Sequence, residues 1–580
     1  MSEDRQMICT RNQLGYPTFS FYWLINSGYP STRPTASSSE MSALHALNPQ
    51  AEHLRRGAAL SMNIQAAESI MELLRTNFGP AGTLKLLISG AGDLRLTKDG
   101  SVLLHEMPIG IPTAALIART ATAQDDTTGD GTTACILLIG QILKQARRFL
   151  GEGVHPRVLV DGLEKAKIRA IEFLNEYSVE DRSDEALTKM AFSALNTKVH
   201  KEMAEQLAQI VVDSLKCIVK PDPETGLCIK GETDLHMVEV MAMQHRTAMD
   251  TRLIRGLVMD HGTHHPAMPT DLRNVHICVL RDSLEFDNTT VNSGTFYKTT
   301  QDRQAFADAE RAVVENKVRK VLALKEKVCA NGEGFLLVNY EGIEPNAYQL
   351  LANEGVMALR RCKLRNLKRL MKATGASPVY SVDDLTPECL GKAGHVWITT
   401  LGEEKFTFVD EVADPTSCTI LIRGPNKHTI KQIQDAVRDG LRAVLNLMEI
   451  GKVVPGAGAF EAAAAEDLEV FKRTVKGKAK LGVQVFADAL NAVPKTLAQN
   501  AGHDPQDALV TIQDAIMEGQ KAGVDIVTGG AIDALEAGIF DNYNVKHQLM
   551  SSSAIIAAQI LLVDEILMAG RQLRVDDMAQ

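Results

Sequence analysis

The stretch Asp125-Asp126-Thr127-Thr128-Gly129-Asp130-Gly131-Thr132-Thr133 is the most informative part of the sequence. It is polar, and it precedes an apolar segment, Ala134 to Leu150, with the composition of a buried helix. Glycines let a ligand approach the backbone, and a helix that begins here offers free N–H groups and a positive dipole end. Threonine hydroxyls can bind phosphate oxygens, and Asp130 can hold a Mg²⁺ that bridges phosphates. The stretch therefore fits a phosphate-binding turn; an ordinary helix N-cap is the alternative.

Regular elements are predicted on both sides of this stretch. Apolar residues at spacings of four and three predict a helix over 57–76, which Gly79-Pro80 ends. Two short strands are expected next, Thr83 to Ser89 and a second one ending at Thr97, with a turn at 90–93 between them. A further helix is predicted over Pro112 to Gln124, because proline suits a first helical turn.

Three glycine turns and one helix are weaker candidates. The turns Gly79-Pro80-Ala81-Gly82, Thr97-Lys98-Asp99-Gly100 and Gly456-Ala457-Gly458 suit either tight turns or close approach of a ligand, and no Walker A spacing is present. A helix over about 429–448 has one apolar face and carries Asp435 and Asp439 on the other. Such a carboxylate can orient a water toward a terminal phosphate. From the residues alone, an ordinary solvated polar face is favoured.

Composition limits the class of protein. A length of 580 residues predicts two to four domains, and the net charge of 62 − 72 = −10 disfavours nucleic acid as the main partner. Nine cysteines without a CxxC spacing indicate reduced thiols, and the densest apolar run, 554–563, is about half of the ~20 residues that a membrane span needs. We therefore expect a cytoplasmic protein with no nucleic-acid or membrane partner. Residues 1–40 lack a secretory pattern and are predicted to be a disordered or spurious extension before Met41.

The predicted secondary structure changes along the chain. Between 220 and 420 it mixes one long charged helix, about Gln301 to Val328, with short strands, predicted at Val275 to Leu280, Gly334 to Asn339, Val396 to Thr400 and Thr419 to Ile422. After 428 it returns to helices and finishes with an apolar segment, 553–569. Helical parts at both ends thus bracket an α/β insert, and together they can form one discontinuous domain.

Two charged clusters have structural interpretations. His261, His264 and His265 have no Cys or carboxylate at ligand spacing, so a zinc site is not expected. Seven Lys and Arg residues between Arg360 and Lys372 predict a basic amphipathic helix. It could touch nucleic acid or a membrane, but the lack of interleaved aromatics favours a solvated face.

The order of these motifs resembles that of the type II chaperonins, the family of the archaeal thermosomes and the eukaryotic cytosolic chaperonin. The resemblance covers Met41 to about Gly570. The stretches 41–49, 423–429 and 435–444 resemble the zeta branch of the family in particular. The implied fold is a multi-domain α and α/β chain with a helical equatorial domain, an intermediate hinge and an α/β apical domain with a helical lid protrusion.

The resemblance also implies domain limits and a function. The equatorial domain would comprise 41–186 and 444–580, the intermediate domain 187–252 and 405–443, and the apical substrate-binding domain 253–404. The chain would join seven paralogous subunits in a hetero-oligomeric double ring. Using ATP/ADP and Mg²⁺, it would hydrolyse ATP to close the lid and fold non-native proteins such as actin and tubulin.

Family roles carry over where residues match. The nucleotide would contact Gly79, Pro80, Asp99, Gly129, Gly131, Thr132, Thr133, Ala134, Thr197, Lys198, Gly456, Ala457, Asp525 and Glu536, and Asp130 would ligate Mg²⁺. Lys198 would sense the γ-phosphate, Asp525 would approach the adenine and Glu536 would bind the ribose. The family's catalytic aspartate lies about 17 residues before the glycine triplet. Since 456 − 439 = 17 and 456 − 435 = 21, Asp439 is chosen, with Asp99 beside the attacking water.

Two residues depart from the family pattern. Ala81 stands where a lysine is usual, and Ala457 replaces a glycine; both departures bear on nucleotide affinity. Neither removes a carboxylate, so hydrolysis is still expected. The alternatives are a ring member that binds nucleotide with little turnover and, more remotely, a soluble phosphotransferase.

Overall fold

The computed structural model describes residues 52–88, 92, 94–219, 233–285, 299–329, 332–401, 404–412 and 416–568. The predicted extension at 1–40 and most of the turn at 90–93 lie outside these ranges. Strand β1 (Glu52–Arg55) pairs with β19 (Glu565–Met568) in a two-stranded sheet of their own. Strands β2 (Lys85–Ile88) and β3 (Leu94–Thr97) form an antiparallel hairpin where two strands are predicted.

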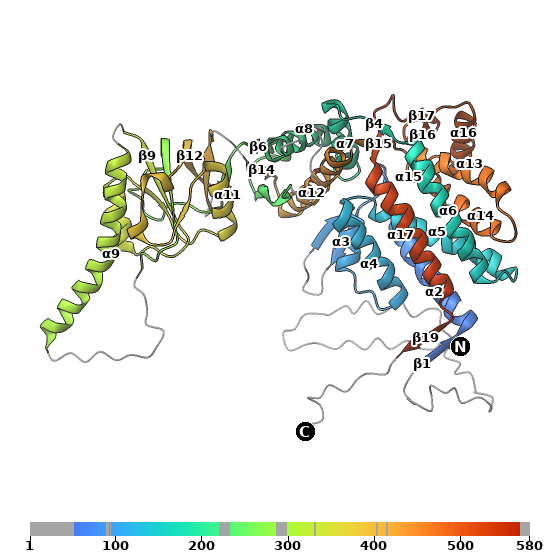
Figure 1. Cartoon of the computed structure of the whole chain (residues 1–580), viewed down its shortest axis with the longest axis horizontal. Helices are drawn as coiled ribbons and strands as arrows, with labels where there is room; N and C mark the ends of the chain where they lie inside the picture. Colours follow the sequence, from blue (N-terminus) through green and yellow to red (C-terminus); the bar gives the residue numbers. More distant parts are fainter. Residues whose placement is uncertain are drawn as a thin grey trace, which may run out of the picture. The chain divides into compact units, whose positions relative to one another are not determined.

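Helices from both ends of the described chain share one apolar core (Figure 1). The helices of this part are α2 (Arg56–Arg75), α3 (Gly100–Glu106), α4 (Pro112–Thr128), α5 (Thr132–Gly151), α6 (Pro156–Tyr177), α13 (Ala459–Thr474), α14 (Lys480–Leu490), α15 (Ala492–Asn500), α16 (Pro505–Met517) and α17 (Tyr543–Leu562). The helix predicted over 57–76 is confirmed, and Ile64, Ala67, Met71 and Leu74 of its expected face are buried.

Two helix limits differ from the prediction. Helix α4 does not end at Gln124 but continues to Thr128, so the first half of the polar stretch is helical and only 129–131 form the turn. The last helix stops at Leu562 and the chain enters β19, although the apolar composition continues to 569. Composition alone does not distinguish a buried helix from the strand that follows it.

A second apolar core forms around α7 (Asp184–Asn196), α8 (Lys201–Ile218) and α12 (Lys427–Ile450). These helices pack with a three-stranded sheet in which β14 (Cys418–Arg423) lies between β5 (Val238–Met243) and β6 (Arg252–Ile254). Strand β14 is parallel to β5 and antiparallel to β6. The predicted helix over 429–448 is confirmed, and its apolar residues Ile430, Ile433, Val437, Leu441 and Val444 are buried in this core.

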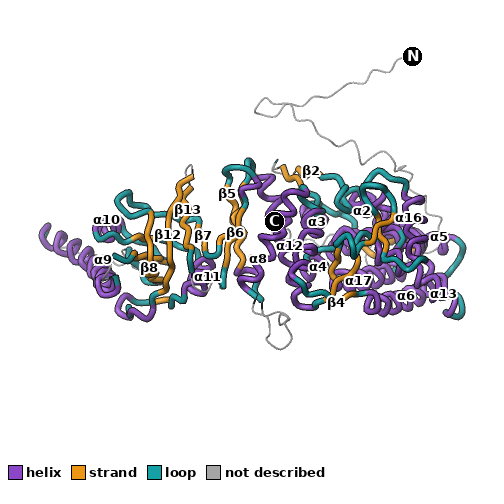
Figure 2. Tube along the Cα trace, turned by 90° about the horizontal axis from the view of Figure 1, so that it is seen from above, coloured by secondary structure: helices purple, strands orange, loops and turns teal. Residues whose placement is uncertain are grey.

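The largest sheet follows the order β10–β9–β8–β12–β13–β7, with β11 also paired to β8. Figure 2 labels β7, β8, β12 and β13 of this sheet. Its strands are β7 (Leu257–Met259), β8 (Asp271–Leu280), β9 (Gly334–Asn339), β10 (Met357–Leu359), β11 (Pro378–Val379), β12 (Gly391–Leu401) and β13 (Glu404–Asp410). Strands β8, β9 and β10 are parallel, with Val279 opposite Val338, whereas β12 and β13 form an antiparallel hairpin. Strand β13 stays in this sheet to Asp410, past the predicted limit at 404.

Helices cover both faces of this sheet. On one face, Cys278 and Leu280 pack with α9 (Thr300–Val328) and α10 (Pro345–Asn353); on the other, Ile277 and Val279 pack with α11 (Leu364–Thr374). This alternation is the period of two that a strand imposes on its side chains.

Two helices of this part correct the sequence-based expectations. The buried residues of α9, which Figure 1 shows as a long helix beside the sheet, are Val314, Val318, Val321 and Leu324, while Val313 of the expected apolar side is 59 % exposed. In α11 the predicted solvated basic face is wrong for Arg369, which is fully buried. Within the described ranges, no helix is both long and apolar enough to cross a membrane.

The remaining strands are short and lie beside the helical core. Strand β15 (Lys452–Pro455) pairs with β4 (Val179–Glu180) and β18 (Phe540–Asn542), and β16 (Ala522–Val524) pairs with β17 (Ala531–Asp533). These strands bring residues from the last part of the chain next to the turn at 129–131, as the lining of the cavities described below shows.

Candidate functional site

The turn between α4 and α5 has a backbone that only glycine adopts easily. Gly129 and Gly131 have φ values of 72° and 82°, in the left-handed region that favours glycine. A Cβ at Gly131 would lie 2.8 Å from Cγ1 of Val545, so a side chain there would also collide. Oδ1 of Asp130 accepts a hydrogen bond from N–H of Gly131 at 2.7 Å, which fixes the carboxylate at the start of α5. Burial raises the pKa of Asp130, and the nearby Lys198 opposes part of this effect.

A narrow polar cavity of about 70 Å³ opens in front of this turn. Its walls come from the loop after α2, the segment that leads into α3, the last turn of α4, the start of α5 and the loop after α7. The lining residues are Asn77, Phe78, Gly79, Lys98, Asp99, Gly100, Asp125, Asp130, Gly131, Thr132, Thr133, Ala134, Thr197 and Lys198. A Cβ at Gly100 would lie 2.8 Å from Oγ1 of Thr133, so this glycine keeps the cavity open. Hydroxyls, helix N–H groups and lysines meet here, which suits phosphate oxygens.

An ion pair links Asp439, which does not line this cavity, to Lys198, which does. Nζ of Lys198 pairs with the carboxylate of Asp439 and lies 3.7 Å from Oδ1 of Asp99. The lysine is held from α12 as well, since Nε2 of Gln432 donates to its carbonyl at 2.9 Å. Asp439 is only 6 % exposed, so the expectation of a solvated face is wrong at this position.

Asp435, the alternative candidate, faces elsewhere. Nη2 of Arg95 donates to Oδ2 of Asp435 at 3.1 Å, and Nη1 of the same arginine binds Glu106 at 2.7 Å. The two aspartates on α12 therefore have different surroundings: Asp439 lies next to Lys198 and Asp99, and Asp435 belongs to an arginine-centred pair on the β2–β3 side.

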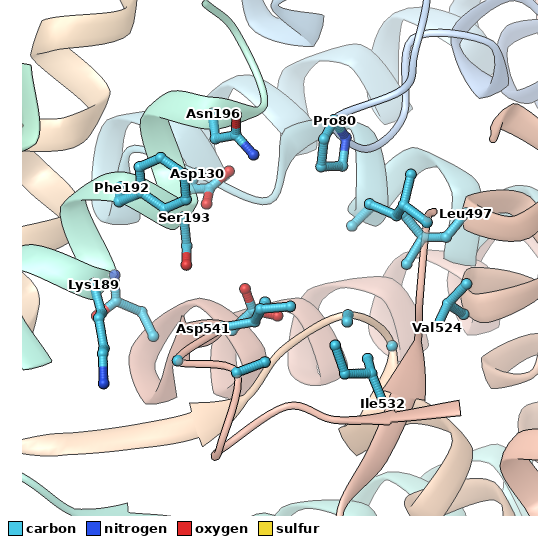
Figure 3. Close-up of a pocket in the computed structure, with 18 of the residues that line it drawn as sticks. Pro80, Asp130, Lys189, Phe192, Ser193, Asn196, Leu497, Val524, Ile532 and Asp541 are labelled. Carbon is cyan, nitrogen blue, oxygen red and sulfur yellow. The ribbon is translucent and has the colours of Figure 1, made fainter. Parts of the chain in front are cut away.

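A larger cavity of about 670 Å³ adjoins the polar one and shares Phe78, Asp130, Gly131 and Ala134 with it. One wall is a single face of α7, with Lys189, Phe192, Ser193 and Asn196 at helical spacing (Figure 3). The other wall is mainly apolar and includes Pro80, Leu497, Val524 and Ile532 (Figure 3). The volume lies in the range of about 300–1,000 Å³ that is common for small-molecule sites.

A buried charge network forms the floor of the larger cavity. Lys546 bridges Glu461 and Asp541, with 2.8 Å between its Nζ and Oδ2 of Asp541. Burial alone would lower the pKa of Lys546, but the two carboxylates outweigh it and raise that pKa. Glu461 is fully buried, and within the described part of the chain its Oε2 has no hydrogen-bond partner. An unsatisfied buried acceptor next to a cavity suits a ligand that carries a hydroxyl or amino donor.

Most of the residues predicted for the site meet around these two cavities. Those that line one or both are Gly79, Pro80, Asp99, Asp130, Gly131, Thr132, Thr133, Ala134, Thr197, Lys198, Ala457 and Asp525. Four do not line either cavity: Asp439, which is linked to the polar cavity only through its ion pair with Lys198, and Gly129, Gly456 and Glu536. Gly129 lies under the side chain of Arg442, Gly456 donates its N–H to the carbonyl of Ile539 at 2.9 Å, and Glu536 is exposed.

Eight charged residues that line the two cavities were not predicted as site residues: Lys98, Asp125, Lys189, Lys201, Glu205, Glu461, Asp541 and Lys546. Lys98 and Asp125 lie inside the motifs quoted above, close to Asp99 and Asp130, so their position in the sequence could have identified them as site residues. Asp541 stands five residues after Glu536, at the place where the structure puts an acid into the larger cavity. The sequence offers no periodicity that ranks one of these acids above the other, because both lie in or beside short turns.

The structure accommodates Ala457 and Ala81, the two residues that the resemblance marks as unusual, through neighbouring residues. Ala457 adopts φ 55°, and a Cβ at Gly523 would lie 2.8 Å from the Ala457 methyl, so Gly523 leaves room for it. Beside Ala81, Nζ of Lys98 donates to the carbonyl of Pro80 at 2.9 Å. A lysine thus lies at this turn, although it comes from a different position of the chain.

The residues present fit a magnesium ion that arrives with a ligand. Within the described ranges, His, Cys, Asp and Glu do not gather in groups of three or more that could hold a metal alone. Asp130 offers one carboxylate at the turn, and Mg²⁺ commonly takes one or two carboxylates together with phosphate oxygens and waters.

Comparison with known proteins gives one consistent result. Residues 70–571 match the model of the TCP-1/cpn60 chaperonin family. T-complex protein 1 subunit zeta-2 of Homo sapiens is 51 % identical over 533 residues, which cover 91 % of this chain and 99 % of that protein. The Mus musculus protein of the same name is 50 % identical over the same coverage. These relatives confirm the resemblance to the zeta branch, and the chain belongs to the TCP-1/cpn60 chaperonin family.

Proposed function

We propose that this chaperonin subunit binds Mg·ATP across the two adjoining cavities and hydrolyses it. The observation that carries the proposal is the meeting of Asp130, Asp99, Lys198 and Asp439 at the N-terminus of α5, beside a cavity large enough for a nucleoside. Family membership supports nucleotide binding independently of this geometry.

The chemistry of each cavity suggests the orientation of the nucleotide. The polar cavity offers the N–H groups and hydroxyls of Thr132 and Thr133, which suit phosphates. The larger cavity offers an apolar wall with Leu497 and Val524 for the base, and Asp541 as an acceptor for the ribose hydroxyls. Asp130 would hold the Mg²⁺ of the substrate, which neutralises developing phosphate charge.

Hydrolysis is assigned to Asp439 with support from Asp99. Asp439 would orient the attacking water, and Lys198, which now pairs with Asp439, would turn to the terminal phosphate. Asp435 has no role in this scheme because it pairs with Arg95. Asp525 lies at the rim of the larger cavity and would approach the adenine, while an exposed Glu536 is replaced by Asp541 as the ribose ligand.

The wider role follows from the family. The chain would act as one subunit of the hetero-oligomeric cytosolic chaperonin, with seven paralogous subunits, and hydrolysis would drive lid closure and folding of clients such as actin and tubulin. The separate cores support a division into equatorial, intermediate and apical parts. Helix α9, whose buried residues all lie between Val314 and Leu324, would be the lid protrusion.

Single-turnover hydrolysis tests the proposal. In a ring where only this subunit keeps its catalytic aspartate, we expect ATP to be cleaved at the rate expected for one active site. Binding of ATP without cleavage would instead favour the second role, a structural ring member with little turnover. Failure to bind ATP in the presence of Mg²⁺ would overturn the proposal.

A further inference from the structure

The C-terminal end of α4 is capped by side chains from α12. The last carbonyls of a helix have no partner inside the helix. Here Nδ2 of Asn446 donates to the carbonyl of Thr128 at 2.9 Å, and Nη1 of Arg442 donates at 2.9 Å to the carbonyl of Asp125, which also accepts the N–H of Gly129 at 2.7 Å. Asn446 is 8 % exposed, so its hydrogen bond is made in a buried setting. Two residues of a helix that is distant in sequence thus complete the end of α4.

The same arginine shapes the turn that follows. A Cβ at Gly129 would lie 2.5 Å from Cβ and 2.6 Å from Cδ of Arg442, so the arginine stem packs directly on this glycine. At the end of α4, Oγ1 of Thr128 lies 2.8 Å from the carbonyl oxygen of Gln124 and 3.0 Å from that of Asp130, and its one hydroxyl proton is shared between these two acceptors. The contacts therefore form a continuous chain from Asn446 and Arg442 to the backbone of Asp130.

Arg442 and Asn446, together called the clamp below, lie on the same face of α12 as Asp439, the aspartate assigned to hydrolysis. Arg442 follows Asp439 by three residues and Asn446 follows Arg442 by four, which places all three on the same side of a helix. Asp439 meets Lys198 and Asp99, while the next two turns hold α4. Asn542 fixes this part of α12 in turn, because its Nδ2 donates to the carbonyl of Ala443 at 3.0 Å.

We propose that Arg442 and Asn446 are positioning residues that set the place of the Asp130 carboxylate from α12. The metal ligand and Asp439 are then aligned by one rigid helix, and a shift of α12 would move both. This inference rests on the proposed function for its catalytic meaning, whereas the clamp itself is a property of the chain alone. Outer-sphere groups that orient a metal ligand commonly change metal affinity by about 10–100-fold when they are removed.

The test uses the full-length chain with Asn446→Leu, which keeps the volume but removes the donor, and Arg442→Ala. Hydrogen–deuterium exchange without nucleotide reports on the turn, and a fluorescent ATP analogue, titrated with Mg²⁺ and in EDTA, reports on metal-dependent binding. We expect amides 129–133 to exchange about tenfold faster and half-saturating Mg²⁺ to rise about tenfold. Affinity in EDTA should change less than about twofold.

Controls separate positioning from general damage. Arg438→Ala removes an arginine from the exposed side of the same helix and should leave both readouts unchanged, since Arg438 is 58 % exposed and lies near Asp435. Arg442→Lys keeps a donor and should restore most of the Mg²⁺ affinity. If Asn446→Leu does not fold, Arg442→Ala alone decides, because Arg442 is 35 % exposed and its loss is better tolerated.

The exchange and Mg²⁺ titration results distinguish a failure of this inference from a failure of the proposed function. Wild-type exchange rates and Mg²⁺ midpoints in both variants would overturn the inference while leaving the proposed function intact. A wild-type chain that binds no nucleotide would overturn the proposed function, and the exchange rates of 129–133 would still decide whether the clamp exists.

Discussion

Lys198 forms an ion pair with Asp439, and its Nζ also lies 3.7 Å from Oδ1 of Asp99. One lysine thus faces two carboxylates that come from different elements, the loop before α3 and helix α12. Two like charges that share a site repel each other unless a cation lies between them. The lysine therefore reduces the repulsion between the two carboxylates beside the polar cavity.

Replacement of Asp439 should separate binding from hydrolysis. Asp439→Asn keeps the shape of the side chain but cannot orient or activate the water as a carboxylate does. We expect single-turnover hydrolysis to fall by about 10²–10⁴-fold, the usual contribution of a positioned acid or base. Affinity for Mg·ATP should change little, as equilibrium binding of a fluorescent analogue would show.

Asp435→Asn is the matched control for this variant. It changes the same residue type one turn earlier on α12, where the carboxylate binds Arg95 and not Lys198. Hydrolysis should stay within about threefold of wild type, because Asp435 lines neither cavity and pairs with Arg95 away from Lys198. Loss of hydrolysis in Asp435→Asn, with activity kept in Asp439→Asn, would reverse the assignment.

The parts of the site that lie on a continuous motif were predictable from the sequence. The turn at 129–131 needs two glycines for its left-handed backbone, and residues 132–134 open a buried helix, so local chemistry and fold agree. The helix carrying Asp439 was predictable from its apolar periodicity. The burial of Asp439 was not, because it depends on Lys198, which is far away in sequence.

Other features depend on tertiary contacts that no local pattern reports. Arg369 looked like one of seven solvated basic residues, yet it is fully buried because strand β14 and Glu239 supply partners for its guanidinium. Glu536 and Asp541 are both acids near short turns, and only pairing of β18 with β15 brings Asp541 to the cavity. The burial of Arg369 and the place of Asp541 at the cavity therefore depend on tertiary contacts, which the residue types alone do not reveal.

Nucleotide affinity should depend on pH through Lys98. Burial lowers the pKa of Lys98 from 10.5 to about 8, so its charge is lost as pH rises through 8. Because Lys98 lines the polar cavity, its cation attracts phosphates below that pH and no longer does so above it. Affinity for Mg·ATP should therefore fall between pH 7 and 9.

Two variants isolate this effect. Lys98→Arg keeps its charge through this range, and its affinity should stay flat with pH, whereas Lys98→Met should be weak throughout. The stability of the fold should depend on pH in the opposite direction from nucleotide affinity. Between pH 8 and 10.5, Lys98 is protonated in the unfolded chain and neutral in the folded one, so its contribution to the free energy of unfolding rises with pH. An equal decline of affinity in wild type and Lys98→Arg would exclude Lys98 as the titrating group.

Ala457→Gly should stabilise the chain slightly. The left-handed conformation at φ 55° costs an alanine about 1–2 kcal/mol relative to glycine. The greater conformational freedom of glycine in the unfolded chain offsets about 0.4–1 kcal/mol of this, so the net gain should lie between about 0 and 1.6 kcal/mol. Ala462→Gly, in the interior of α13, should destabilise by about 1 kcal/mol or more. Chemical denaturation of the two variants side by side would check the opposite signs.

The largest loss of stability should come from Arg369. Its guanidinium donates to Oγ of Ser417 at 3.2 Å and to Oε2 of Glu239 at 3.1 Å, and burial lowers its pKa to about 10. Arg369→Leu would leave Glu239 without its buried partner, and removal of one member of a buried pair costs about 3–5 kcal/mol. Arg365 binds the same carboxylate at 2.9 Å but is 55 % exposed, so Arg365→Leu should cost at most about 1 kcal/mol. Denaturation midpoints, with exchange of the β14 amides as a local probe, would measure both variants. Equal losses of stability in the two variants would mean that the exposed Arg365 stabilises Glu239 as much as the buried Arg369 does, and the prediction for Arg369 would be wrong.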